Sequence, residues 1–108
     1  MSNTNLKQID FLVLAVLRKG PLHGYGIVRQ LDALTDGAVQ LRPGDVYRVL
    51  YRMEKARLLQ EAGEGSTESG RRTNYAITDA GRQMLASQAE ILASVAAGVL
   101  AAEGTDNV

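Results

Sequence analysis

The side chains best suited to chemistry in this chain are arginines and tyrosines gathered in one short stretch, residues 41–57. The stretch has five cations and two anions, so its local charge is +3. The cations are Arg42, Arg48, Arg52, Lys55 and Arg57, and the anions are Asp45 and Glu54. Tyr47 and Tyr51 lie one helical turn apart among them. Guanidinium groups hydrogen-bond guanine edges and phosphate oxygens, and these residue types together are suited to nucleic-acid binding.

The apolar residues of the same stretch predict a helix that carries these side chains on its outer side. They recur at i, i+3, i+4 and i+7, which is the spacing of one buried helical face. They are Val46, Val49, Leu50 and Met53. Pro43 suits the first turn of a helix, and we expect the helix to run from there to about Arg57. A solvated surface helix has the same pattern, so the stretch alone leaves both interpretations open.

Other kinds of site have little support in the sequence. The chain has no cysteine, which excludes disulfides, thiolate metal sites and a cysteine nucleophile. Its one histidine, His23, cannot form a multi-histidine metal site and is expected to cap or pack a helix. A nucleotide-binding loop at Gly24–Gly26 is disfavoured, because no strand is expected before it and the glycine fingerprint is incomplete. We therefore expect no enzyme activity, no metal and no cofactor.

Length and charge limit the remaining function classes. The 108 residues correspond to one small domain, for which oligomerisation is a plausible source of stability. The net charge is zero, which counts against a generic nucleic-acid binder. The charge is nevertheless segregated, since residues 58–70 hold Glu61, Glu64 and Glu68 but no cation. The longest apolar run, residues 11–17, is too short for a membrane span, and no secretion signal is evident. A cytoplasmic protein without a membrane partner is expected.

Hydrophobic periodicity and turn signals predict the remaining elements. We expect helices over residues 5–18, 23–34 and 79–102, a very short strand at 39–41, strands at 58–62 and 72–78, and a polar loop at 63–70. This order is typical of a winged helix-turn-helix, a mainly α fold with a small β-hairpin. Residues 1–78 would form the DNA-binding domain, and residues 79–108 a C-terminal dimerisation helix and tail. Thr78 is the expected N-cap of that last helix.

The last predicted helix has an apolar seam with no evident partner in so short a chain. Its residues alternate four and three apart, as in helices that pair with one another. The predicted dimer interface consists of Met84, Leu85, Gln88, Ile91, Leu92, Val95 and Val99. Small residues nearby leave room for an apolar ligand between this helix and the first one. The candidate ligand-binding residues are Phe11, Leu14, Ala89 and Ala93.

Three sequence motifs resemble the PadR family of bacterial transcriptional regulators. They are Gly20–Ile27 (GPLHGYGI), Pro43-Gly44 followed by Val46–Glu54 (VYRVLYRME), and Gly70-Arg71-Arg72 followed by Tyr75–Arg82 (YAITDAGR). The resemblance extends over about residues 6–100. It implies a dimeric repressor that binds an inverted-repeat operator in double-stranded DNA and is released by a small hydrophobic or aromatic effector. The implied DNA-binding residues are Arg42, Gly44, Tyr47, Arg48, Tyr51, Arg52, Arg71 and Arg72.

Arg48 and Arg52 lie one turn apart, so both guanidinium groups are expected to point outward together. Three features depart from the family's pattern. A small hydroxyl residue is usual at the position of Asp45, where an acid is expected to repel phosphate. A glycine is usual at the position of Arg57, so the helix is expected to end differently. The hairpin also carries Glu64 and Glu68, which repel phosphate. These departures keep an alternative open, a winged-helix protein-interaction module or anti-repressor without DNA affinity.

Overall fold

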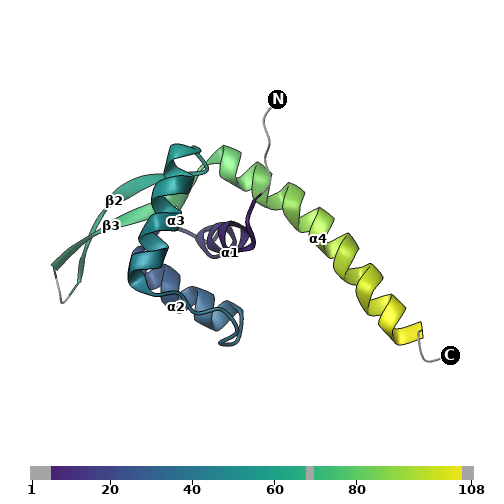
Figure 1. Ribbon diagram of the computed structural model, residues 1–108. Coiled ribbons are helices and arrows are strands. Elements are labelled where there is room, and N and C mark those ends of the chain that lie inside the picture. Colours follow the sequence, from purple (N-terminus) through teal and green to yellow (C-terminus); the bar gives the residue numbers. More distant parts are fainter. Residues whose placement is uncertain (1–5, 68–69, 106–108) are drawn as a thin grey trace.

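Three short helices form a compact head, and a long fourth helix leads away from it (Figure 1). The computed structural model describes residues 6–67 and 70–105. The elements in chain order are α1 (Gln8–Leu17), β1 (Leu22–His23), α2 (Gly24–Leu34), α3 (Pro43–Lys55), β2 (Leu59–Thr67), β3 (Gly70–Ile77) and α4 (Asp79–Thr105). The predicted fold class, a mainly helical winged helix-turn-helix with a C-terminal helix, is confirmed.

The core forms where the apolar faces of α1, α2 and α3 meet. Each helix contributes side chains that are less than one-tenth exposed, because amphipathic helices this short are stabilised chiefly by burying their apolar face. The buried apolar residues are Val13, Leu14, Val16, Leu17, Ile27, Leu31, Val46, Val49, Leu50, Met53, Leu59 and Ile77. The four apolar residues predicted for α3 are all among them. The outer side of α3 is therefore left for polar side chains.

His23 begins α2, as expected from its position before the helix. Its Nδ1 accepts a hydrogen bond of 3.1 Å from the backbone N–H of Gly26. This bond satisfies one of the N–H groups that a helix start leaves without a partner. His23 is thus a capping residue, and it also belongs to β1.

The third strand of the sheet is not the predicted one. The sheet has the order β1-β3-β2, with Leu22 opposite Tyr75. The expected strand at residues 39–41 was wrong, since these residues form no regular structure. The backbone N–H of Val39 donates instead to Oγ1 of Thr35, at 3.0 Å. A two-residue strand is determined by pairing with a partner far away in the chain, and local periodicity carries no signal for it.

The hairpin of β2 and β3 is longer than predicted. The expected loop at residues 63–70 is mostly strand, since β2 continues to Thr67 and β3 begins at Gly70. Strand pairing continues past Gly63 because of a bulge, in which Ala62 and Gly63 lie opposite the single residue Asn74. Gly63 has φ +93°, a conformation that favours glycine. Glu68, part of the predicted acidic hairpin, lies outside the described residues.

The turn between α3 and β2 uses an arginine where a glycine is expected. Arg57 has φ +65°, so the predicted avoidance of a left-handed cap was wrong. The N–H of Arg57 donates to the carbonyl of Glu54 at 2.9 Å, and that of Leu58 to the carbonyl of Met53 at 3.0 Å. These two bonds form a Schellman motif, which satisfies carbonyl groups at the helix end. The capping bonds thus hold a non-glycine residue in a strained conformation.

The first turn of α4 is fixed against this same turn. The N–H of Thr78 donates to the carbonyl of Leu58 at 3.1 Å, and Thr78 Oγ1 accepts from the N–H of Gly81 at 3.0 Å. The predicted N-cap role of Thr78 is therefore confirmed. A β-carbon at Gly81 would overlap the carbonyl oxygen of Leu58, so only glycine allows the helix to approach so closely.

α4 first packs across α1, and beyond Ala89, its last partly buried residue, it leaves the head (Figure 1). Every residue from Glu90 to Ala102 is exposed. Residues 79–102 have a mean hydropathy of 1.6 over their most apolar window, and by length and composition alone they could cross a membrane. An apolar helix face of this extent in water needs a covering partner.

The strained cap at Arg57 generates a stability prediction. The variant Arg57→Gly is expected to raise the free energy of unfolding by about 1 kcal/mol, because glycine adopts the left-handed region without a β-carbon clash. Urea denaturation monitored by circular dichroism measures this change. Arg57→Ala is the matched control, since it removes the charge but keeps the β-carbon. Equal stabilisation by alanine and glycine would show that the charge, and not the backbone, is responsible.

Candidate nucleic-acid interface

The outer face of α3 is a stripe of exposed residues spaced four, three and four positions apart. It consists of Gly44, Arg48, Tyr51 and Lys55, and we call it the α3 outer face. The Arg48 side chain is 80% exposed. The ammonium group of Lys55 lies 5.3 Å from the centroid of the Tyr51 ring, within range of a cation–π interaction. Lys55 was not among the predicted contacts, although its place one turn after Tyr51 puts it on this face.

Arg48 has an acidic neighbour on its own helix. Its Nη2 lies 2.5 Å from Oδ1 of Asp45, three residues earlier. Both side chains are at least two-fifths exposed, and an ion pair in that environment contributes little to stability. Asp45 was expected to repel phosphate, but here its charge is compensated by Arg48. A nucleic acid could replace Asp45 as the partner of Arg48 at small cost.

Arg52 is held in a different way, and the expectation that it points outward beside Arg48 was wrong. Its guanidinium Nη2 donates to Oδ1 of Asp10 in α1. Asp10 is 6% exposed, and its Oδ2 accepts from the backbone N–H of Lys7 at 3.3 Å. The Arg52 side chain remains 42% exposed. Nothing in local periodicity pairs two residues that are 42 positions apart, so the sequence analysis missed Asp10.

Tyr47 lies on the flank of α3 away from Arg52, where its ring packs over the start of α2. It is 44% exposed, so its ring is only partly at the surface. A β-carbon at Gly24 would lie 2.7 Å from Cζ of that ring, closer than real contacts allow. Gly24 is buried, and its lack of a side chain allows this close packing. Tyr47 is therefore both a packing residue and a candidate contact at the edge of the α3 outer face.

Two carboxylates lie near the same flank of α3. Burial raises the pKa of the Tyr75 hydroxyl above its usual value, and the charges of Glu61 and Glu54, with the nearby Tyr47, raise it further. A phosphate approaching this side would meet two carboxylates. The side suited to a polyanion is thus the α3 outer face, away from Glu54.

The remaining predicted DNA contacts lie just before α3 and on the hairpin of β2 and β3. Arg42 is exposed immediately before α3, at its N-cap position. Arg72 is half-buried in β3, in the strand pair opposite Gly65. The side chain of Arg71 lies outside the part of the chain that the structure describes. Glu64 is exposed on β2, so the hairpin carries charges of both signs.

The predicted dimer residues divide into two groups along α4. Met84, Leu85 and Gln88 are partly buried, and Leu85 packs against the core of its own chain. The others are exposed: Ile91, Leu92, Val95 and Val99. We call these four the α4 strip. Leu100, which the prediction did not include, is 71% exposed.

Phe11 separates two grooves between α1 and α4. One groove, of about 400 Å³, is lined by Phe11, Ala15, Arg18, Arg82, Leu85, Ala86 and Ala89. The other, of about 440 Å³, is lined by Leu6, Lys7, Gln8, Phe11, Leu12, Gln88 and Leu92. Two of the predicted ligand residues, Phe11 and Ala89, therefore line a groove. Leu14 has no exposed area and Ala93 lines neither groove.

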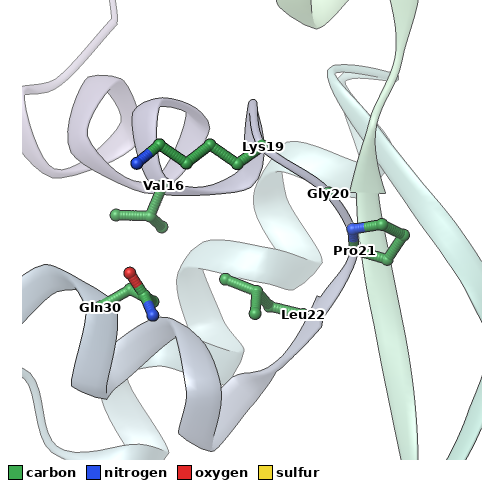
Figure 2. A pocket seen from close by; sticks show the side chains of 6 residues that line it. All are labelled: Val16, Lys19, Gly20, Pro21, Leu22 and Gln30. Carbon is green, nitrogen blue, oxygen red and sulfur yellow. The ribbon is translucent and has the colours of Figure 1, made fainter.

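A smaller hollow of about 170 Å³ lies between the end of α1 and α2 (Figure 2). It is lined by Val16, Lys19, Gly20, Pro21, Leu22 and Gln30, and in Figure 2 the Lys19 side chain extends above Val16. This hollow has one cation and no aromatic residue. It lacks the combination of guanidinium and phenol groups that distinguishes the α3 outer face.

Comparison with protein families gives one match, over residues 13–87, to the family described as transcriptional regulator PadR-like. A protein from a Streptomyces fradiae transposon is 33% identical over 92% of this chain. The chain spans only about a quarter (27%) of the length of that relative.

Solved structures share the fold. A PadR family transcription regulator from Clostridium difficile is 26% identical with a TM-score of 0.69, covering 87% of this chain and 99% of that one. Bacillus subtilis PadR, crystallised with operator DNA, is 20% identical with a TM-score of 0.67, covering 76% of this chain and 46% of that one. The second likeness shows the fold alone.

Proposed function

The chain belongs to the PadR-like family of transcriptional regulators, and we propose that it is a cytoplasmic repressor that binds an inverted-repeat operator in double-stranded DNA. The observation that carries this proposal is the α3 outer face, with its exposed arginine, tyrosine and lysine. A helix with a buried apolar back and a cationic, aromatic front fits the major groove. The operator complex of Bacillus subtilis PadR is a precedent for DNA binding by this fold.

The residues of the interface divide by the kind of contact they suit. Arg48 is nearest the N-terminus of α3 among the exposed cations of that helix, the end that usually enters the groove, and it is assigned to a base edge. Lys55 is a point charge near the other end of the helix and suits a phosphate. Tyr51 suits a phosphate or a thymine methyl group, and Tyr47, on the flank near Glu54, suits a thymine methyl group. Arg42, Gly44, Arg52, Arg71 and Arg72 complete the proposed contacts, all to the DNA backbone.

The α4 strip is proposed to cover its counterpart in a second copy of the chain. It has four apolar residues that remain 44–57% exposed. Burying each such side chain contributes roughly 1.5–3 kcal/mol. Four per chain suffice to offset a large part of the cost of association. A homodimer also matches an operator made of two inverted half-sites, since both have two-fold symmetry.

The two grooves beside Phe11 are proposed to hold the effector. Each is large enough for a small aromatic or aliphatic molecule, and most of the residues that line it are apolar. Leu92, a member of the α4 strip, lines one of them. A ligand in that position would lie at the dimer interface and could alter how the two heads are held. An apolar effector is favoured over a strongly charged one.

The assignment of α3 predicts different effects for two substitutions. Arg48→Ala should cost about 1–3 kcal/mol of binding free energy and relax specificity at one base pair, because a base contact is lost. Lys55→Ala should weaken binding to all sequences alike. It should also lower the salt slope, which is the slope of log affinity against log salt concentration, by about one. Fluorescence anisotropy would measure both, on a duplex selected by the wild-type protein from a random pool and on a scrambled duplex, across a salt series.

Arg82→Ala is the charge-matched control for this experiment, since Arg82 lies at the α1–α4 groove and should leave both measurements unchanged. If Arg48→Ala and Lys55→Ala both bind as tightly as wild type, α3 does not read DNA. The protein would then be a winged-helix interaction module, an alternative that its zero net charge supports.

The proposed dimer predicts the effect of a charge in the α4 strip. Leu92→Asp should produce a monomer or an unfolded chain, because an unpaired carboxylate would be buried between the two helices. Sedimentation equilibrium at micromolar concentration measures the mass. Ser94→Asp introduces the same charge on the opposite side of α4 and should remain dimeric. A compact wild-type monomer at this concentration would contradict the dimer.

The proposed effector site predicts the effect of filling a groove. An anilinonaphthalene sulfonate dye is the probe, since its fluorescence rises in apolar surroundings. Ala89→Leu should weaken dye binding about tenfold, a loss of roughly 1.4 kcal/mol, because the added methylene groups occupy the groove. Ala97→Leu adds the same volume outside both grooves and should bind the dye as wild type does. Unchanged affinity in a dimeric Ala89→Leu variant would contradict this placement.

A further inference from the structure

We propose that Asp10, a residue of α1, is a positioning residue for DNA binding, which holds the guanidinium group of Arg52 in place for a backbone phosphate. This inference rests on the proposed DNA-binding function and extends it beyond α3 and the hairpin. A negatively charged residue, Asp10, is thereby given a role in binding DNA, which is itself negatively charged.

The environment of Asp10 is the first observation in support. Among the residues that the structure describes, it is the one buried side chain that carries charge or polarity. Both of its carboxylate oxygens accept hydrogen bonds, Oδ2 from the N–H of Lys7 and Oδ1 from Arg52. A buried carboxylate needs such partners, because it has lost its hydration. The carboxylate is therefore fixed in one position, between the start of α1 and the flank of α3.

The geometry of the Arg52 side chain is the second observation. A guanidinium group has five N–H donors in a rigid plane, and the bond to Asp10 uses Nη2. The side chain is still 42% exposed, so part of it remains at the surface. A planar group tied at one edge loses little further freedom when another edge binds a phosphate. Asp10 thus pre-organises Arg52 for an anion at the surface of the head.

The contrast with Arg48 gives the third observation. Arg48 has a partner, Asp45, that is itself 42% exposed, and its own side chain is 80% exposed. That pair can rearrange to reach a base edge, whereas Arg52 is attached to a buried group on another helix. Arg52 lies one turn after Arg48, on the side of α3 that faces α1. Side chains on the flank of a helix in the major groove are those that meet the DNA backbone.

The direction in which DNA affinity changes when the charge of Asp10 is removed separates a positioning role from simple repulsion of phosphate. Removing an acidic group from a DNA-binding protein should strengthen its binding to every duplex, because repulsion of phosphate is relieved. If Asp10 instead withheld Arg52 from the DNA, removing it should also strengthen binding. Only a positioning role makes the loss of this negative charge weaken the complex.

The experiment compares Asp10→Asn, Arg52→Gln and the double variant with the wild-type protein. Affinity would be measured by fluorescence anisotropy across a salt series, on the duplex that wild type selects from a randomised pool. Asp45→Asn is the matched control, as it removes the same charge from the partner of Arg48. Circular dichroism and a thermal melt would confirm that each variant is folded at the assay temperature.

Asp10→Asn is expected to bind about tenfold more weakly, as for the loss of one charge-assisted hydrogen bond, and to lower the salt slope by about one. The double variant should bind like Arg52→Gln alone, since Asp10 acts through that residue. Asp45→Asn should bind as tightly as wild type or more tightly. If Asp10 only stabilised the fold, the slope of log affinity against log salt concentration would be the same for the folded variants as for wild type.

Equal or tighter binding by folded Asp10→Asn would overturn the proposal for Asp10, while the DNA-binding function would stand. If Asp10→Asn does not fold, Arg52→Lys takes its place, because it keeps a cation beside the carboxylate but has no planar fork. It should fold and bind more weakly, and wild-type affinity would overturn the proposal. Failure of the wild-type protein to select any duplex would overturn both inferences.

Discussion

A buried carboxylate determines how the head of this protein is assembled. Asp10 is largely removed from water, and a charged group in such a place must be compensated by hydrogen bonds and an opposite charge. One compensation is local, from the N–H of Lys7, and the other comes from Arg52 on α3. Because Arg52 must reach this carboxylate, α3 cannot rotate or slide freely along α1. Apolar packing alone would permit such movement more readily, since it is non-directional.

This constraint places α1 at the centre of the molecule in both position and chemistry. α1 packs against α2 and α3 on one side and against α4 on another (Figure 1). Asp10 faces α3, and the next residue, Phe11, lines both grooves beside α4. The first turn of α1 therefore borders both the surface that we propose for DNA and the one that we propose for an effector.

Much of the fold follows from short-range patterns in the sequence. The spacing of four apolar residues located the buried side of α3, and the residue types around it identified the outer face. His23 and Thr78 were recognisable as caps because capping depends on residues three positions apart. The features that were missed depend on long-range contacts. β1 exists through its pairing with β3, and the partner of Arg52 lies 42 positions away.

The positions of glycine in the sequence led to two wrong predictions, one about a loop and one about the end of a helix. Gly63 and Gly65 suggested a loop, but the bulge at Gly63 lets the strand continue. At the end of α3 a glycine was expected in the left-handed position, yet Arg57 adopts it. The reason lies in the neighbouring contacts, since Thr78 bonds both to the carbonyl of Arg57 and to that of Leu58. A local propensity of about 1 kcal/mol is outweighed when several hydrogen bonds fix the same turn.

The close contact at Gly81 fixes the position of the first turn of α4, from which the long helix extends. The helix has 27 residues, so it extends about 40 Å from its fixed first turn, at 1.5 Å for each residue. A tilt of about 10° at that turn would move the far end by roughly 7 Å, twice the rise of a base pair. In a paired molecule, the angle at which each helix leaves its head would set the distance between the two heads. The space around Gly81 would set the angle of α4, and this angle would in turn set the length of DNA that the two heads can span.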